Sequence, residues 1–201
     1  MWGRDAAGDA TSGYGSHEDH IVDPYVKGMR QLLKALGSSR VADLGCGDFN
    51  IGRQIAPYCS EYIACDVSEF ILARNRAKFG AGNVTFVNLD LSADEPPRAD
   101  LAIIRQVLQH LSNAEIKSFA DRLNTSKPYK YLLVTEHVPD GEFQSNMDAS
   151  TGHDIRVAID SGVVLHDAPF NLIHRARRVL HEVRADSHGK SAVIRTTLYS
   201  F

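Results

Sequence analysis

Apolar residues recur along the chain at two alternating periods. From residue 21 to 36 they follow helical spacing, and Gly37 stands where a helix C-terminal cap belongs. Beyond it, short runs of mostly apolar residues alternate with further helical segments. The expected strands are 41–44, 62–65, 84–88, 101–104 and 131–135, and the expected helices are 51–58, 68–79 and 112–123. Strands that are apolar on both sides are typical of a parallel sheet covered by helices on both faces.

The last third of the chain departs from this alternation. Residues 179–185 and 191–199 read as two strands joined by a polar turn, which predicts an antiparallel hairpin. The expected fold class is therefore α/β: a Rossmann-like, doubly wound, mostly parallel seven-stranded sheet with a C-terminal antiparallel hairpin. Residues 137–170 carry little pattern, and a connection of this length in a compact domain is usually functional.

The domain organisation follows from the same pattern. We expect residues 20–201 to form a single domain. Residues 1–19 are rich in Gly, Ser, Asp and Ala and favour neither helix nor strand. We interpret them as either a flexible leader or a lid that orders over a ligand.

Composition excludes several classes of protein. With 201 residues, 43% hydrophobic and 23% charged, the chain is neither disordered nor fibrous. A formal charge of −3 leaves no basic surplus for a phosphate backbone, so we expect no nucleic-acid partner. No apolar run approaches the ~20 residues of a membrane helix, and we expect a cytoplasmic protein without a membrane partner. Three cysteines without a CxxC pair predict neither a disulfide framework nor a zinc site.

The strongest chemical signal is the turn after the first strand, which reads Asp43-Leu44-Gly45-Cys46-Gly47-Asp48. A Gly-x-Gly turn between a strand and a helix lets the backbone approach a ligand closely. Asp66 follows the next strand, at the position where an acidic residue accepts hydrogen bonds from both ribose hydroxyls. Together they indicate a site for a nucleoside-containing ligand.

Two residues narrow the kind of nucleoside. A dinucleotide site needs a third glycine three positions after the second, and Asn50 stands there. Asp48 would repel a pyrophosphate and attract an ammonium group. We therefore expect a ligand that carries a cation and lacks bridging phosphates, and a nicotinamide enzyme is disfavoured.

At these positions the sequence resembles the class I S-adenosylmethionine-dependent methyltransferases. The resemblance covers about residues 38–136 and depends on the run 43–47, on Asp66, on Asp90 after the third strand and on the stretch 100–111. It implies S-adenosyl-L-methionine as the cofactor. The implied cofactor-binding residues are Asp43, Gly45, Cys46, Gly47 and Asp48 around the methionine part, Asp66 at the ribose, Asp90 and Leu91 at the adenine, and also Val67 next to Asp66 and Arg105 and Gln106 after the fourth strand.

Methyl transfer requires a positioned acceptor and, for a hydroxyl, a group that removes its proton. His137, at the end of the fifth strand, is the preferred general base, with His110 and Arg105 as further catalytic candidates. We expect Tyr14, His153, Asp154 and Arg156 to contact a small polar acceptor, and we expect no metal.

The function we expect is S-adenosylmethionine-dependent methyl transfer to a small-molecule acceptor, with oxygen favoured over nitrogen as the atom methylated. N-methylation stays open, as does a non-catalytic module that binds adenosylmethionine. The fourth strand is not followed by an Asn/Asp-Pro-Pro-aromatic sequence, which argues against adenine amine methylation. The oligomeric state does not follow from the sequence.

Overall fold

The computed structural model describes residues 11–37 and 39–201 of the chain, so the part of the expected leader before residue 11 lies outside it. Within this range seven strands form one sheet in the order β3-β2-β1-β4-β5-β9-β8. The parallel strands are β1 (Arg40–Leu44), β2 (Glu61–Asp66), β3 (Val84–Asn88), β4 (Leu101–Arg105) and β5 (Tyr131–Pro139). The antiparallel hairpin consists of β8 (Ala176–Arg184) and β9 (Ala192–Ser200), and β9 pairs with β5. This confirms the expected fold class.

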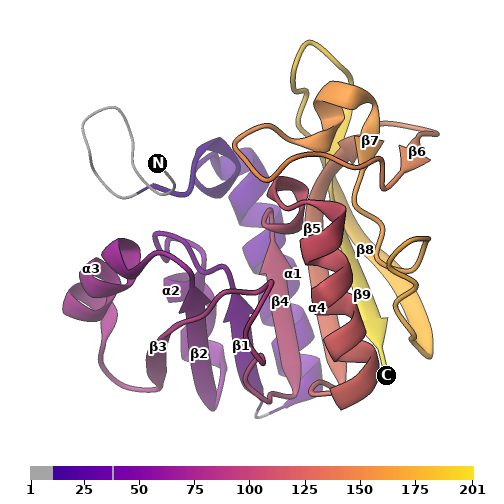
Figure 1. Cartoon of the computed structure of the whole chain (residues 1–201). Helices are drawn as coiled ribbons and strands as arrows, with labels where there is room; N and C mark the ends of the chain where they lie inside the picture. The colour runs from indigo at the N-terminus through magenta and orange to yellow at the C-terminus, as the bar shows by residue number, and fades with distance from the viewer. Residues whose placement is uncertain (1–10, 38) are drawn as a thin grey trace.

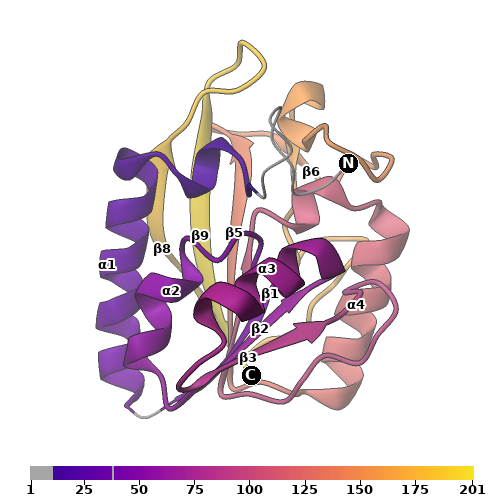
Figure 2. The ribbon, with the colours of Figure 1, turned by 90° about the vertical axis from the view of Figure 1, so that its left-hand side faces the viewer.

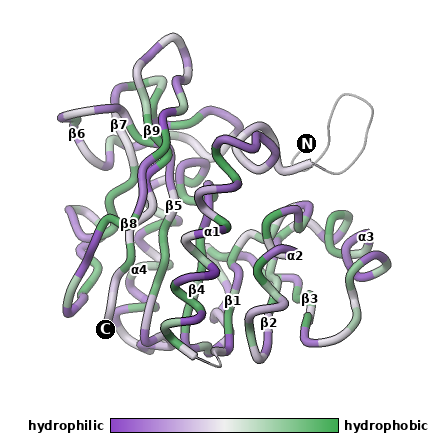
Figure 3. The backbone as a smooth tube through the Cα atoms, turned by 180° about the vertical axis from the view of Figure 1, so that it is seen from behind, coloured by the Kyte–Doolittle hydropathy of each residue, from purple (hydrophilic) through white to green (hydrophobic). Residues whose placement is uncertain are grey.

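Helices cover both faces of the sheet. Figure 2 shows α1 (Asp19–Leu36) on one side and α4 (Asn113–Ser126) on the other. The short α2 (Gly52–Ile55) and α3 (Glu69–Phe79) share the side of α1, where their apolar residues join one hydrophobic cluster with β1, β2 and β4. A second cluster packs α4 against the opposite face. Hydrophobic residues recur along the central strands between these layers (Figure 3).

Local sequence explains where two of these helices begin. The Ser68 hydroxyl accepts a hydrogen bond from the backbone N–H of Ile71 and caps α3. Ser112 and Glu115 form a reciprocal capping box at the start of α4. Both helix starts were expected from the sequence. The segment expected as one helix over 51–58 is instead divided into α2 and the 3₁₀ turn η2 (Ala56–Tyr58), which contains Pro57.

The fifth strand is longer than expected. It runs to Pro139 because β9 pairs with it along its full length, so Glu136 and His137 lie inside β5 and do not follow it. Beyond it, the weakly patterned connection forms β6 (Gln144–Ser145), the 3₁₀ turn η4 (Arg156–Ile159) and β7 (Ser161–Gly162), and β6 pairs with β7. These elements lie above the carboxyl end of the sheet in Figure 1.

The 3₁₀ turn η1 (Tyr14–Ser16) precedes α1 at the same end of the molecule, and η3 (Leu108–His110) follows β4. Over residues 11–37 and 39–201, none of the helices combines the length and the apolar character needed to cross a bilayer.

Candidate functional site

The glycine turn after β1 is held close to two neighbouring strands. The backbone N–H groups of Gly45 and Cys46 both donate to the carbonyl of Cys65 in β2, each over 2.8 Å. Gly45 has φ +99°, and a Cβ placed on it would lie 2.3 Å from Cγ2 of Val107. Glycine is therefore required here both for its backbone conformation and for close packing. The Cys46 side chain is buried, and burial raises the pKa of its thiol, so it is an inert part of the turn.

Asp66 ends β2 with its carboxylate against the glycine turn. Oδ2 accepts the backbone N–H of Gly47 over 2.9 Å, and Oδ1 accepts that of Ser68 over 2.9 Å. Burial raises the pKa of Asp66 above its usual range, although these hydrogen bonds oppose the shift. In the described ranges no cation forms an ion pair with it. The backbone N–H of Val67 also bonds to this carboxylate. Because a carboxylate has about four acceptor positions, Asp66 keeps one for a hydroxyl group.

Asp43 lies deeper, as the second-to-last residue of β1 before the glycine loop. It is buried, and its Oδ2 accepts a hydrogen bond of 2.8 Å from the hydroxyl of Tyr62. Burial raises the pKa of Asp43 to about 7. The structure therefore places this carboxyl under the loop.

Asp48 is engaged by residues from before α1. Its Oδ2 accepts the backbone N–H of Ser12 over 2.9 Å and lies 2.6 Å from Nε2 of His17. In return, the backbone N–H of Asp48 donates to the Ser12 hydroxyl over 2.7 Å. Burial alone would raise the pKa of Asp48, but the hydrogen bonds from Asn50, His17 and Ser12 outweigh it and hold the pKa below its usual range.

Residues 11–18 thus lie over the glycine turn. Ser12 Oγ would be 2.0 Å from a Cβ on Gly47, and the side-chain amide of Asn50 donates to the carbonyl of Ser16 over 2.7 Å. Tyr14, which we expected at the acceptor, is 62% exposed, with its ring edge-on to that of His20.

Arg105, the last residue of β4, reaches the same segment. Its Nη1 donates to the Ser16 hydroxyl over 3.1 Å, and its Nη2 donates to the carbonyl of Gly15. The guanidinium is buried over the ring of Tyr25, 5.0 Å from the centroid, and its Nε has no hydrogen-bond partner within the described residues. Gln106 follows with φ +55° and accepts from Arg105 Nη1 over 2.9 Å.

The remaining cofactor residues expected from the sequence follow β2 and β3: Val67 comes directly after β2, and Asp90 and Leu91 come after β3. The side chain of Val67 is 61% exposed beside the Asp66 carboxylate, whereas Leu91 is buried in the core. Asp90 accepts hydrogen bonds from the hydroxyl and backbone N–H of Ser92, and these hold the pKa of Asp90 below its usual range.

A buried carboxylate of β5, Glu136, binds the backbone N–H groups of the turn after β4. Glu136 of β5 accepts the backbone N–H groups of Val107 over 3.3 Å, Leu108 over 3.0 Å and Gln109 over 3.0 Å. Burial raises the pKa of Glu136 to about 7, against the effect of these hydrogen bonds. Sequence reasoning did not assign Glu136 a role; its one signal was an acidic residue adjoining an apolar strand.

Arg156 holds the opposite, carbonyl side of the same turn. Its guanidinium donates to the carbonyls of Met147, Leu108 and Leu111 over 3.0, 3.1 and 2.7 Å, and to Oδ1 of Asn113 over 2.9 Å. The side chain is fully buried. Each guanidinium nitrogen is therefore already bonded within the protein, and none is left to bind an acceptor. His153 and Asp154, on the same connection, are exposed.

The two candidate histidines have different partners. His137 is buried, and its Nε2 hydrogen-bonds to the carbonyl of Ala185, which assigns the proton to Nε2 and leaves Nδ1 as an acceptor. His110 places Nδ1 3.1 Å from the carbonyl of Gly152 and Nε2 3.3 Å from Nε2 of Gln109. Burial lowers the pKa of both imidazoles, so both are neutral at pH 7.

Comparisons with known proteins agree with this geometry. Residues 42–126 match a family model described as a methyltransferase domain. No curated protein sequence matches the chain significantly. Among solved structures, the N-methyltransferase NodS from Bradyrhizobium japonicum WM9 in complex with S-adenosyl-L-homocysteine superposes with a TM-score of 0.63 at 12% identity, covering 92% of this chain and 89% of that one.

Two further structures are similar to a comparable degree. The N-terminal domain of EvdMO1, in the presence of S-adenosylhomocysteine and D-fucose, gives a TM-score of 0.62 at 17% identity over 100% of this chain and 91% of that one. The methyltransferase domain of bacterial CtHen1 gives 0.62 at 16% identity over 88% and 97%. At these identities the structural likeness establishes the fold.

Proposed function

We propose that the chain is a class I S-adenosylmethionine-dependent methyltransferase and that it transfers a methyl group from S-adenosylmethionine to an oxygen atom of a small polar acceptor; the match of residues 42–126 to a methyltransferase domain and the shared fold support this. The observation that carries this proposal is the Asp66 carboxylate, which is fixed against the Gly45–Gly47 turn by the N–H of Gly47 and keeps an acceptor position for a hydroxyl group.

The residues along this rim fit the cofactor. Asp66 accepts hydrogen bonds from the ribose hydroxyls, and the exposed side chain of Val67 supplies apolar surface for the adenine, with Asp90 and Leu91 at its border. The Gly45–Gly47 turn, with the buried Cys46, faces the methionine part. When bound, S-adenosylmethionine supplies a methyl group on a positively charged sulfur, and the ionised carboxylate of Asp48 favours such a cation electrostatically, with Asp43 under the loop beside it.

Residues 11–18 act as the lid of this site. The contacts that support this role join the segment to the rim: Ser12 and His17 to Asp48, Ser16 to Asn50, and Gly15 and Ser16 to Arg105. Arg105 and Gln106 therefore serve the cofactor from the end of β4 and hold the lid above it. A closed lid excludes water and keeps the acceptor in place.

His137 is the general base that removes the acceptor proton. Its Nε2–H is committed to the carbonyl of Ala185, and in the described part of the chain no group hydrogen-bonds to Nδ1. Its lowered pKa keeps the imidazole unprotonated, as a base requires. Both ring nitrogens of His110 have protein partners, which supports a positioning role for it. Tyr14, His153 and Asp154, all exposed around the rim, contact the acceptor.

Transfer to nitrogen is the second candidate, because NodS and the glycopeptide methyltransferase MtfA, which are similar in fold, act on nitrogen. The discriminating experiment incubates the protein with S-adenosylmethionine and matched pairs of small hydroxylated compounds and their amino counterparts, and measures the release of S-adenosylhomocysteine. We expect release with the hydroxylated member of a pair. Release with amines alone would establish N-methylation, and binding of the cofactor without release across the panel would favour a non-catalytic module.

A further inference from the structure

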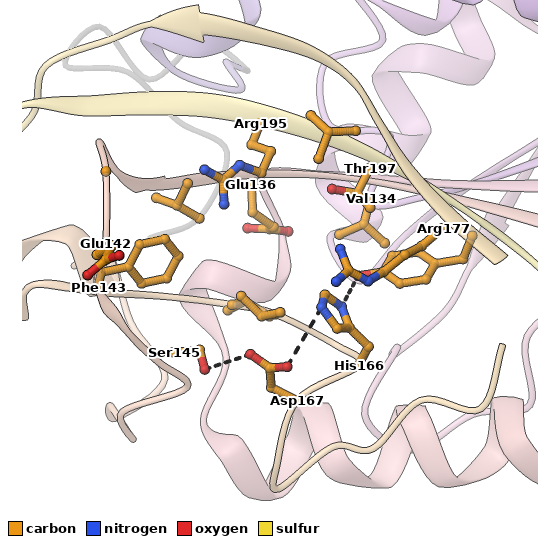
Figure 4. A pocket seen from close by; sticks show the side chains of 16 residues that line it. Val134, Glu136, Glu142, Phe143, Ser145, His166, Asp167, Arg177, Arg195 and Thr197 are labelled. Carbon is orange, nitrogen blue, oxygen red and sulfur yellow. Dashed lines mark hydrogen bonds and ion pairs between the residues drawn. The ribbon is translucent and has the colours of Figure 1, made fainter.

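A cavity of about 450 Å³ lies against the strands β5, β9 and β8, away from the glycine turn. Figure 4 shows its lining side chains, which come from these strands and from the connection after β5. The cavity exists because residues 140–175, all of them described, form no α-helix that would cover this part of the sheet. Cavities of this size accommodate small organic ligands.

Most charged groups of the cavity already have protein partners. Arg195 forms an ion pair of 2.5 Å with Glu182, and Glu136 is bonded to the turn after β4. The hydroxyl of Ser145 donates to Asp167 over 2.9 Å. None of these groups is available as the principal contact of a charged ligand.

Arg177 of β8 is different. It lies directly opposite Tyr199 in the register of β8 with β9, on the face that lines the cavity. Within residues 11–37 and 39–201, its guanidinium has no hydrogen bond and no ion pair. Figure 4 shows it next to His166, whose Nδ1 lies 3.0 Å from the Tyr199 hydroxyl. At this end of the cavity an exposed guanidinium without a partner among the residues that the structure describes therefore lies beside His166 and Tyr199.

Apolar side chains line much of the remaining wall, together with Thr197 and the exposed Glu142. Its apolar side chains come from β5, from β8 and from the connection after β5: Val134, Val138, Phe143, Val163 and Val179. The geometry points to a second ligand site in this cavity, which binds a small organic anion with its carboxylate or phosphate group against Arg177 and its apolar body against the valines and Phe143. A guanidinium binds either kind of oxyanion through paired hydrogen bonds.

This site is separate from the one proposed for the cofactor. The backbone of Val107 bonds to Glu136 on the cavity side, whereas its side chain packs on Gly45 on the other side. The turn after β4 thus forms a wall between the cavity and the glycine turn. Occupation of one site is therefore expected to leave the other accessible.

The test uses benzoate, phenyl phosphate and the neutral benzamide as probes in isothermal titration calorimetry of the full chain. We expect one of the two anions to bind and benzamide not to bind; which anion binds tells a carboxylate site from a phosphate site. In Arg177→Gln the affinity should fall about tenfold or more, the scale of a lost charged hydrogen bond. Arg178→Gln is the matched control, because Arg178 is the next residue of β8, is also exposed and does not line the cavity.

Saturation with S-adenosylhomocysteine serves as the second control, and it should leave anion binding unchanged. The proposal is overturned if neither anion binds, if benzamide binds as well as the anions, or if Arg177→Gln and Arg178→Gln behave alike. Displacement of the anion by S-adenosylhomocysteine would also overturn it, since that result would locate the anion at the glycine turn. The affinity for S-adenosylhomocysteine is measured in a titration of its own. Failure of the anion site is therefore distinguishable from failure of the methyltransferase proposal.

Discussion

The backbone N–H of Gly47 donates a hydrogen bond of 2.9 Å to Oδ2 of Asp66. This bond joins the turn after β1 to the carboxylate at the end of β2, so neither group can be placed without the other. It also orients the carboxylate toward the turn, where a ligand that approaches the glycines meets it.

The contact between His17 and Asp48 joins the proposed lid to the glycine turn. Replacing His17 with Ala removes the 2.6 Å contact and should speed dissociation of S-adenosylhomocysteine about two- to fivefold, the scale of a half-exposed hydrogen bond. Stopped-flow release and hydrogen exchange of residues 12–18 measure the effect. Lys27→Ala, an exposed change on α1, is the control. Equal release rates in the two variants would contradict the lid assignment.

The bonds of Arg156 stabilise the turn after β4. Arg156→Ala leaves the carbonyls of Leu108 and Leu111 without their buried donor and should lower the free energy of unfolding by about 2–4 kcal/mol. Chemical denaturation measures the loss. Lys117→Ala, on the exposed side of α4, should change stability by less than about 0.5 kcal/mol. A loss of similar size in both variants would argue against the structural role of Arg156.

The buried carboxyl of Asp43 makes stability depend on pH. Its pKa of about 7 in the folded protein exceeds the value of ~3.9 usual for an unfolded chain, so between these values the folded state holds a proton that the unfolded state lacks. The free energy of unfolding therefore falls as pH rises from about 4 to 7, by at most ~1.4 kcal/mol per pH unit from this group, and levels off above 7.

Asp43→Asn keeps an acceptor for the Tyr62 hydroxyl and removes this titration. Urea unfolding of both proteins at several pH values between 4.5 and 8 gives the slope of the free energy of unfolding against pH for each. All other titrating groups contribute equally to the two slopes. The variant should lose less stability than the wild type over this interval. Parallel curves would show that Asp43 does not take up the proton.

His137 should act on turnover and leave cofactor affinity unchanged. His137→Ala is expected to lower the rate of methyl transfer about 100-fold, the low end for loss of a general base. Because burial lowers the pKa of His137, the wild-type rate should stay level down to pH values below the usual imidazole range and then fall as the ring is protonated. The variant should lack that fall. An unchanged rate would remove His137 as the base.

Much of the fold could be predicted because its determinants are local. The Ser112–Glu115 capping box and the Ser68 cap each lie within four consecutive residues, and the mostly apolar strands predict a buried parallel sheet. The turn from Gly45 to Gly47 and the acid at Asp66 were likewise found from spacing alone. These features need no knowledge of distant partners.

The other features depend on partners far along the chain. Glu136 bonds to a turn about 28 residues before it, and Arg156 to carbonyls more than 40 residues before it. Charged residues in a polar stretch are expected to be exposed and available to a ligand. For this reason the sequence predicted that Arg156 contacts a substrate, whereas its side chain is buried. The extension of β5 past Thr135 depends on β9, and the docking of Ser12 on Asp48 spans 36 positions.

The most direct measurement is calorimetric titration of S-adenosylhomocysteine into the wild type, Asp66→Ala and Glu61→Ala. Glu61 is the acidic residue at the opposite end of the same strand and is the matched control. We predict binding to the wild type and to Glu61→Ala alike, no binding of NAD, and a loss of about 10- to 100-fold in Asp66→Ala, as expected for hydrogen bonds to a charged group. Equal affinities in all three proteins, or binding of NAD in place of S-adenosylhomocysteine, would contradict the central claim that this carboxylate holds the ribose of the cofactor.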